Sequence, residues 1–552
     1  MTSKKSLLNT IFVTIAFIFT AMLVFKHVSS FRMTNSDILF IESLYRDFFE
    51  NSFPIIGWQI LRAPSFLPDW PLYFFSRWIT GDFSAAHQIY MPVILVFHLL
   101  FFSWMIKFFF ANKISRLENY FFAIGLGFLM TTPLIFMPSG FYYTDIPLYD
   151  PAIHSSTFLW GFPILMLWLK QLEGPKIQSP FHLFLIGCAC IIATASDLWF
   201  MFQFIIPLIA SEFLFRMWKK QSLKTLFKFF ITLFVGTSIG FGLPYLFSYL
   251  GWFILPDARV GEPFTGFLPF LNQFYDQLHT FKNSFRTCFQ YVPIYALAAI
   301  IAFYVSIKSL NKFRKESKLN SNPDDSLSLF GLQLFFILSF LAPMSLIVTK
   351  GMWAGIGNFR YLIPTFILSF FIVGYWIIRL CIQWKQVHKS IFWLSIIAYF
   401  CTAMMKLPWP VSFHRTGYPA EMECLDAVAY EHSLKNGLSE YWLAKFTTNL
   451  SKRGLLINQM TYHFEPHFWI NNYHWYLSDD GKSIREYDFF VSYKNDETRK
   501  RVPLEIGEPS VIHDCGAYDI MVFKDEKRKH FNEFLRPKME EFLSKFEKTK
   551  FN

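Results

Sequence analysis

The sequence predicts a mainly α-helical protein that crosses a membrane many times and ends in a small α/β domain outside it. Of its 552 residues, 53% are apolar and only 16% are charged, and the mean hydropathy is +0.31. Several apolar runs approach the roughly 20 residues that a helix needs to cross a bilayer. The residues after 406 are more polar and contain short strand-like stretches. These observations define a polytopic membrane protein with a separate C-terminal domain.

About eleven apolar runs account for the predicted transmembrane helices. Their approximate ranges are 7–26, 89–112, 119–137, 154–172, 183–197, 198–216, 229–251, 287–307, 328–348, 361–379 and 390–405. The first run follows Lys4 and Lys5, as in a signal peptide, but no small-x-small cleavage site follows it. We therefore expect it to be retained as a helix.

Basic residues predict the orientation of the helices. Lys and Arg gather at the N-terminus and in alternate gaps, such as 113–116, 216–224, 308–318 and 379–389. Cytoplasmic loops carry such an excess, so the N-terminus is predicted to be cytoplasmic and the C-terminus exterior. The formal charge of +11 is explained by these loops, which argues against a nucleic acid partner.

The predicted domains are a transmembrane domain over 1–406 and an exterior α/β domain over 407–552. Strands are expected near 455–457 and 518–523, and helices near 420–434 and 529–548. Cys424 and Cys515 both fall in the exterior domain. An oxidising exterior would allow them to form a disulfide, although pairing does not follow from sequence alone.

The first exterior loop, 27–88, carries an acidic residue near its start. Asp37 opens a predicted amphipathic surface helix over 37–50, and a second surface helix is expected from about Asp69. The predicted apolar face of the first helix contains Ile38, Ile41, Leu44, Tyr45, Phe48 and Phe49, and its polar face contains Glu42, Ser43, Arg46, Asp47 and Glu50. Asp37 has two interpretations, a helix N-cap or a catalytic carboxylate.

The second exterior loop, 138–153, carries further polar residues beside the membrane. Asp145, Asp150 and, at the start of the next helix, His154 have ordinary interpretations as turn or helix-start residues. Together with Asp37 they form a carboxylate-rich patch predicted on the exterior face, where Asp197 also falls. The sequence contains no HExxH or paired CxxC arrangement, so no motif signals a metal site.

These features resemble the GT-C membrane glycosyltransferases. The shared features are a first helix, a long first exterior loop with an early acid and two surface helices, further membrane helices and an exterior C-terminal domain. Asp37 occupies the place of the family's first-loop catalytic acid, but Ile38 follows where many members have Glu. The Trp-Trp-Asp motif of oligosaccharyltransferases is absent, and Tyr441-Trp442 is only a faint echo of it. Segments 437–445 and 469–472 look like bacterial members, which implies a bacterial inner membrane and a periplasmic C-terminal domain.

The resemblance implies transfer of a sugar from a polyprenyl-phosphate donor to a glycan, lipid or protein acceptor, usually with inversion. Asp37 is then the general base, because a carboxylate accepts the proton of the attacking group. Arg360 is the first candidate to bind the donor phosphate, and Lys350 and Arg62 are second choices. Anchoring at the membrane interface is the alternative role of Arg360. The remaining candidates, for orienting the acceptor or holding a divalent metal ion, are Asp145, Asp150, His154 and Glu42.

Two other classes of function remain open. A transporter or glycolipid flippase would place ionisable residues deep within the helices. A non-catalytic membrane scaffold would bind a partner through its exterior domain. Most charges in this sequence fall at helix ends or in loops, which favours chemistry at the membrane surface.

Overall fold

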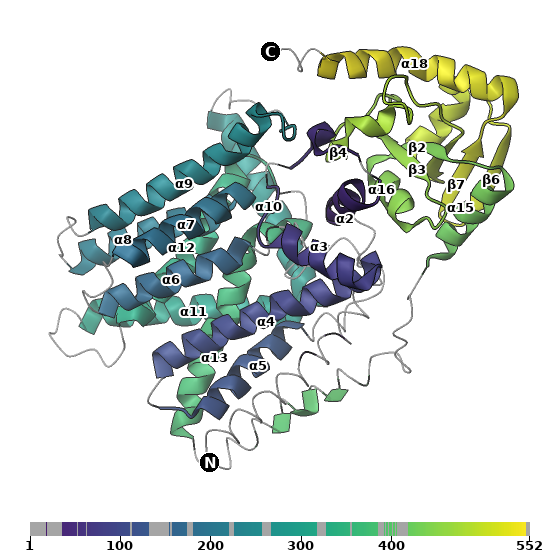
Figure 1. Ribbon diagram of the computed structural model, residues 1–552. Coiled ribbons are helices and arrows are strands. Elements are labelled where there is room, and N and C mark those ends of the chain that lie inside the picture. The colour runs from purple at the N-terminus through teal and green to yellow at the C-terminus, as the bar shows by residue number, and fades with distance from the viewer. Residues whose placement is uncertain are drawn as a thin grey trace. The chain divides into compact units, whose positions relative to one another are not determined.

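A computed structural model describes most of the chain (Figure 1). The described residues are 36–51, 53–61, 63–110, 113–131, 154, 157–173, 180–219, 226–256, 267–316, 327–353, 356–384 and 418–547, with isolated positions within 18–22 and 391–405. Two of the predicted spans, 7–26 and 390–405, therefore lie almost wholly outside the described residues.

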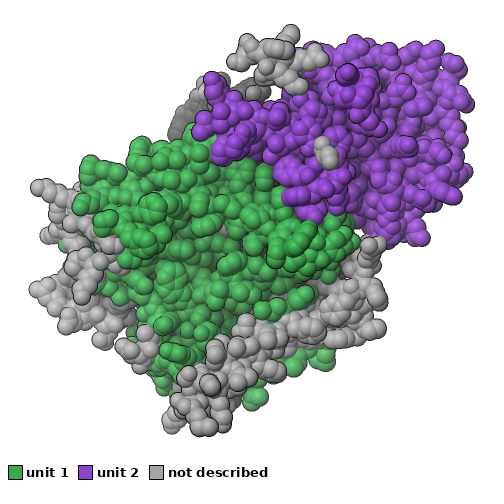
Figure 2. Space-filling model, in the orientation of Figure 1, with its two compact units in different colours: residues 1–31, 63–244, 258–412 green, residues 32–62, 245–257, 413–552 purple. Residues whose placement is uncertain are grey.

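The chain forms two compact units (Figure 2). Unit 1 comprises 1–31, 63–244 and 258–412. Unit 2 comprises 32–62, 245–257 and 413–552, so the C-terminal residues share a unit with part of the first loop and with a second short segment.

Unit 1 consists of helices. Their bounds are α3 (Asp69–Thr80), α4 (Phe83–Phe110), α5 (Arg116–Thr131), α6 (Thr157–Glu173), α7 (Pro180–Ser196), the π-helix η4 (Met201–Ile205), α8 (Ile206–Lys219), α9 (Leu226–Tyr249), α10 (Phe267–Tyr291), α11 (Pro293–Glu316), α12 (Leu327–Thr349), the 3₁₀-helix η6 (Ile356–Leu362) and α13 (Ile363–Gln383). Helix α12 packs against α6, α8, α10, α11 and α13, and so forms the centre of this bundle.

Several helices of unit 1 are suited to a membrane. Among the described residues, six segments are long and apolar enough to cross a bilayer: Phe83–Phe110, Met201–Lys219, Phe227–Tyr249, Pro293–Phe313, Leu327–Thr349 and Asn358–Gln383. Helix α7 is apolar but shorter. The protein is therefore a multi-pass membrane protein, while the predicted total of eleven spans stays a prediction.

The predicted span 287–307 is divided in the structure. Residues 287–291 complete the amphipathic helix α10, and α11 begins separately at Pro293. Proline has no backbone N–H to donate and its φ suits the first turn of a helix, so it starts α11 rather than continuing α10. Hydropathy alone does not detect this break because both sides of it are apolar.

Unit 2 has a mixed α/β fold. Its elements are α2 (Ser36–Phe49), the 3₁₀-helix η1 (Ile55–Gly57), β1 (Trp58–Gln59), α15 (Ala420–Glu431), β2 (Asn436–Glu440), α16 (Tyr441–Leu450), β3 (Leu456–Met460), β4 (Asn471–Asn472), the 3₁₀-helix η7 (Tyr473–Tyr476), β5 (Phe489–Tyr493), α17 (Glu497–Arg501), the π-helix η8 (Val502–Ile506), β6 (Val511–Cys515), β7 (Tyr518–Val522) and α18 (Asp525–Glu547). This confirms the small C-terminal sheet region.

The main sheet has the strand order β3-β2-β5-β7-β6. Strand β2 is parallel to β3 and β5, whereas β7 is antiparallel to β5 and β6. Gly437 in β2 pairs with Phe489 in β5, and an added Cβ on this glycine would collide with the Phe489 ring. The absence of a side chain there lets the two strands pair.

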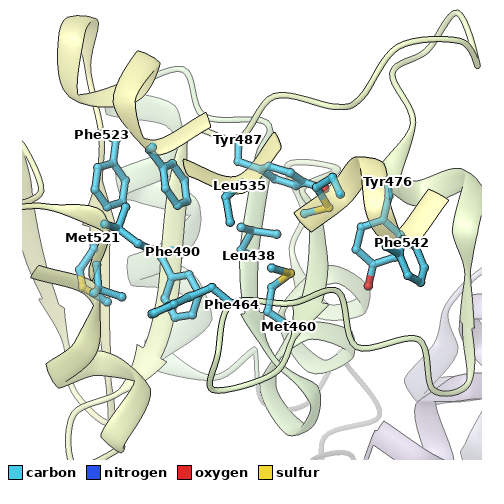
Figure 3. Packing of buried hydrophobic residues seen from close by; sticks show 14 of the residues in the cluster. Leu438, Met460, Phe464, Tyr476, Tyr487, Phe490, Met521, Phe523, Leu535 and Phe542 are labelled. Atoms are coloured by element: carbon cyan, nitrogen blue, oxygen red, sulfur yellow. The ribbon is translucent and has the colours of Figure 1, made fainter. Parts of the chain in front are cut away.

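The core of unit 2 lies between this sheet and α18 (Figure 3). Leu438, Phe490 and Met521 come from the sheet, and Leu535 and Phe542 come from α18. These side chains are almost fully buried, with Phe542 the most exposed at 8%. Hydrophobic burial of this face therefore fixes the long, highly charged α18 against the sheet.

Two further chain segments complete unit 2. Strand β1 pairs with β4, and Ile254 joins β1 through the bonds Ile254 N to Trp58 O, 2.7 Å, and Ile60 N to Ile254 O, 3.0 Å. Helix α2 packs against α16. Glu42, Ser43 and Asp47 of α2 are buried, so the prediction that they lie on a water-facing side of a surface helix is wrong. Hydrophobic periodicity assigns the faces of a helix from residue type alone. Here the polar side chains of α2 are buried because long-range hydrogen bonds satisfy them.

The second helix of the first loop begins at Asp69, where the sequence places it. Its exposed side carries large apolar residues, since Phe75, Trp78 and Ile79 are 59%, 72% and 56% exposed. Such a face suits the boundary between lipid and water.

Candidate functional site

A carboxylate–histidine pair lies in unit 1, where α7 gives way to the π-helix η4. The carboxylate of Asp197 is fully buried and lies 2.6 Å from Nδ1 of His154. The backbone N–H of Trp199 donates to its other oxygen, Oδ1, at 2.8 Å. Turns of π-helix are frequent at functional sites. The carboxylate fixes the orientation of the imidazole, which is the arrangement used to position a proton-transfer group.

A tyrosine adjoins this pair, and an arginine lies over the tyrosine ring. Nε1 of Trp199 and Nε2 of Gln203 donate to the carbonyl oxygen of Tyr361 at 3.1 and 2.9 Å. The ring of Tyr361 lies 5.3 Å from the His154 ring, centroid to centroid. The guanidinium of Arg360 lies 5.2 Å from the centroid of the same tyrosine ring. Tyr361 therefore contacts both the cation and the imidazole.

The position of Arg360 suits an anionic ligand at the membrane. It lies in η6, directly before the apolar helix α13. A guanidinium offers several N–H groups in one plane and matches phosphate oxygens well. The described residues of this cluster thus combine a fixed cation, an oriented imidazole and a buried carboxylate.

A second cluster surrounds Asp37 in unit 2. Asp37 is the second residue of α2, and its carboxylate oxygen Oδ1 accepts a hydrogen bond from the hydroxyl of Tyr441. The hydroxyl of Ser36 donates to the carbonyl oxygen of Tyr441 at 2.7 Å. The start of α2 is thereby joined to the start of α16. Negative charge is favourable in the first turn of a helix, so an acidic residue suits the position of Asp37 at the start of α2.

A buried lysine accompanies Asp37. Nζ of Lys445 donates to Oε1 of Gln459 at 3.1 Å and lies 4.8 Å from the centroid of the Tyr441 ring. Burial lowers the pKa of Lys445 to about 7, while the charge of Asp37 acts in the opposite direction. The side chain of Lys445 is 1% exposed. Lys445 therefore loses its proton near neutral pH, well below the usual range of a lysine.

A third buried acid, Asp47, has a structural environment. Its Oδ2 accepts from Nε1 of Trp58 at 2.8 Å, from Nε1 of Trp475 at 3.0 Å and from Nδ2 of Asn472 at 2.9 Å. Burial raises the pKa of Asp47 to about 6, against the effect of these hydrogen bonds. The carboxylate joins α2, β1 and the segment around β4.

The other predicted site residues are placed as follows. Glu42 is fully buried and pairs with Nε of Arg46 at 3.0 Å. Lys350 is exposed, in the turn after α12. Arg62, Asp145 and Asp150 lie outside the described residues. Asp37 belongs to unit 2, whereas His154, Lys350 and Arg360 belong to unit 1.

The two exterior-domain cysteines are bonded to each other. A disulfide joins Cys424 to Cys515, whose Cα atoms lie 5.5 Å apart. It connects α15 to the end of β6. In the described part of the chain, no group of three or more His, Cys, Asp and Glu side chains is arranged to hold a metal ion.

Sequence reasoning missed Tyr441 and Lys445 as partners of Asp37. They lie about 400 residues further along the chain, and no periodic pattern connects such positions. The Tyr441-Trp442 pair was the available signal. The sequence places Asp197 on the same face as the carboxylate-rich patch, but only the fold shows its bond to His154.

Comparison of the sequence with protein-family models and with curated proteins finds no match to either. The apolar helices define the class, a multi-pass membrane protein with a mixed α/β unit.

Proposed function

We propose that the protein is a GT-C-type membrane glycosyltransferase, which transfers a sugar from a polyprenyl-phosphate donor to a glycan, lipid or protein acceptor. The observation that carries the proposal is the placement of Arg360 before α13 and over the ring of Tyr361, which in turn lies beside His154 of the His154–Asp197 pair. A lipid phosphate stays at the membrane surface because its tail remains in the bilayer. A fixed guanidinium at the end of an apolar helix is suited to meet it.

In this proposal Asp37 acts as the general base. The acceptor oxygen or nitrogen attacks the anomeric carbon, the bond from that carbon to the phosphate oxygen breaks, and the acceptor proton passes to the Asp37 carboxylate. The lipid phosphate leaves with the electron pair and is stabilised by Arg360. One displacement inverts the anomeric centre. The hydroxyl of Tyr441, bonded to Oδ1, orients the carboxylate for this step.

The remaining candidates have supporting roles in the proposal. Lys350 and Arg62 are further ligands for the donor phosphate. Asp145, Asp150, His154 and Glu42 are candidates to orient the acceptor or to hold a divalent metal ion. For His154, the bond to Asp197 favours an orienting role.

The proposed location is a bacterial inner membrane with a cytoplasmic N-terminus and a periplasmic C-terminal domain. The Cys424–Cys515 disulfide supports this, because disulfides persist in oxidising compartments such as the periplasm.

The first test is Asp37→Asn in purified protein with radiolabelled polyprenyl-phosphate sugars and membrane extract as acceptor. Loss of the base should lower the transfer rate by about 10²–10⁴-fold. Glu50→Gln is the matched control, since Glu50 directly follows the same helix, α2, and is 41% exposed. Transfer by Asp37→Asn at the rate of the control would remove Asp37 as base.

The second test separates transfer from transport. Arg360→Gln should weaken use of the donor, whereas Arg379→Gln, at the other end of α13, should not. The assay is run in detergent micelles, where a flippase has no second leaflet to deliver its lipid to and a scaffold consumes no donor. Donor consumption with formation of a glycosidic product identifies a transferase. Lipid movement in vesicles without any product would establish the flippase instead.

A further inference from the structure

A large pocket lies within unit 2, away from the residues assigned to transfer. It is formed between the segment 477–486 and one side of α18, and its volume is about 1090 Å³. Ligand pockets usually measure roughly 300–1,000 Å³, so this one has room for more than one ring-sized group.

An anchored arginine forms part of the pocket wall. Arg485 is 7% exposed, and its Nε donates to the carbonyl oxygen of Trp475 at 3.0 Å. Its Nη1 donates to Oδ1 of Asn436 at 3.3 Å and pairs with Asp479 at 3.0 Å. Among the described residues, Nη2 donates to none. The guanidinium is therefore held in position with donor capacity left over for a ligand.

The charges around the pocket nearly cancel. Lys482, Arg485, Arg528 and Arg536 are the cations, and Asp479, Glu486 and Glu540 are the acids. Asp479 pairs with Arg485, and Glu486 lies 3.4 Å from Nη2 of Arg528. The acidic side chains would repel a polyanion, and the arginines would repel a polycation. The wall instead supplies interspersed donors and acceptors, which suits hydroxyl groups that both donate and accept.

An apolar surface lies beside these polar groups. Leu477, Leu543 and Phe546 line the pocket and are partly exposed. The ring of Phe546 stacks on Tyr473 with centroids 5.1 Å apart and an interplanar angle of 8°. A second ring, Phe468, lies 4.7 Å from it. A fixed aromatic side chain next to planar polar groups matches a sugar ring, which has apolar C–H faces and a rim of hydroxyls.

We propose that this pocket binds a neutral oligosaccharide. Arg485, Asp479 and Arg536 hydrogen-bond its hydroxyl groups, and Phe546 packs against one ring face. The pocket volume, the balanced charge and the anchored guanidinium carry this inference. It does not depend on Asp37 or on sugar transfer, because every residue involved lies within the C-terminal part of unit 2.

The experiment uses the full-length protein in lipid nanodiscs, because alkyl glycoside detergents carry competing sugar headgroups. Saturation-transfer NMR and calorimetry are run with neutral probes (maltotetraose, cellotetraose, mannotriose and chitotriose). Trigalacturonate and glucose 1-phosphate are the anionic probes. We expect at least one neutral probe to bind, and Asp479→Ala combined with Arg536→Ala to weaken it by about tenfold or more. Both residues are exposed, so the fold should survive.

Lys500→Ala is the matched control, because Lys500 is 62% exposed and lies on α17, outside the pocket. It should leave binding unchanged, and so should Asp37→Asn, which separates this site from the proposed transfer chemistry. The proposal is overturned if no neutral probe binds, if only anionic probes bind, or if the double variant binds as tightly as the control.

Discussion

The two units satisfy their polar side chains in different ways. In unit 1, many hydroxyl groups return to the carbonyl of their own helix: Thr232 of α9 donates to Lys228 at 2.9 Å and Thr349 of α12 to Ser345 at 2.7 Å. In unit 2, side chains bond across hundreds of residues, as Trp475 does to Asp47 and Tyr441 to Asp37. A helix in lipid gains from closing its polar groups locally, whereas the α/β unit uses polar groups to join separate chain segments.

The sharpest way to test this contrast is to remove Asp47. Asp47→Ala leaves the indole N–H groups of Trp58 and Trp475 and the amide of Asn472 without their acceptor. Each buried unsatisfied group costs about 1–3 kcal/mol, so we expect unit 2 to lose about 3–5 kcal/mol. Hydrogen exchange followed by mass spectrometry should show faster exchange in 436–476 and unchanged exchange in α12.

Glu50→Ala is the control for Asp47, because it changes an exposed acid three residues further along the chain, just past the end of α2. Similar exchange rates in the two variants would mean that the Asp47 network does not hold unit 2 together.

The next largest effect is expected from the disulfide. Replacing Cys424 and Cys515 by Ser opens a covalent link between residues 91 apart. A link of this span stabilises by about 2–4 kcal/mol in typical proteins, chiefly through the entropy of the unfolded chain. Urea unfolding followed by tryptophan fluorescence should show this loss. Cys401→Ser, at an exposed free cysteine, should have no effect. Equal urea midpoints for the variant without Cys424 and Cys515 and for Cys401→Ser would contradict this expectation.

A smaller, pH-dependent effect is expected at Lys445. Its pKa is about 7 when folded, below the unfolded value of about 10.4. Between these values the unfolded chain holds a proton that the folded chain has released, so stability rises as pH rises through this window. Below pH 7 both states hold the proton and the dependence vanishes. We expect a gain of about 2 kcal/mol from pH 7 to 9.

Lys445→Met should abolish this gain, because methionine fills similar space without a charge. Lys500→Met should retain it, since Lys500 is an exposed lysine of the same unit. Urea unfolding at pH 6, 7, 8 and 9 measures the slope. Parallel slopes for the wild type and Lys445→Met would assign the dependence to another group.

The same contrast explains what the sequence predicts and what it does not. The apolar runs of α4, α9 and α12 are predictable because crossing lipid demands about twenty apolar residues. The strands near 456 and 518 are predictable from the short apolar run 455–457 and from the largely apolar run 518–523. The partners of Asp37 and Asp47 are not, because a pattern within α2 carries no information on residues more than 400 positions away. Local patterning thus describes unit 1 better than unit 2.

The smallest predicted effects come from a Ser→Ala substitution made once in each unit. Ser76→Ala in α3 removes a hydroxyl that bonds back to its own helix, and alanine favours helix, so the change should stay within about 0.5 kcal/mol. Ser439→Ala in β2 removes a buried bond of 2.7 Å to the carbonyl of Val491 in β5 and should cost about 1 kcal/mol. Hydrogen exchange of α3 and of β5 measures both. If Ser76→Ala cost as much as Ser439→Ala, the local bonds of unit 1 would contribute as much as the long-range bonds of unit 2, and the distinction between them would fail.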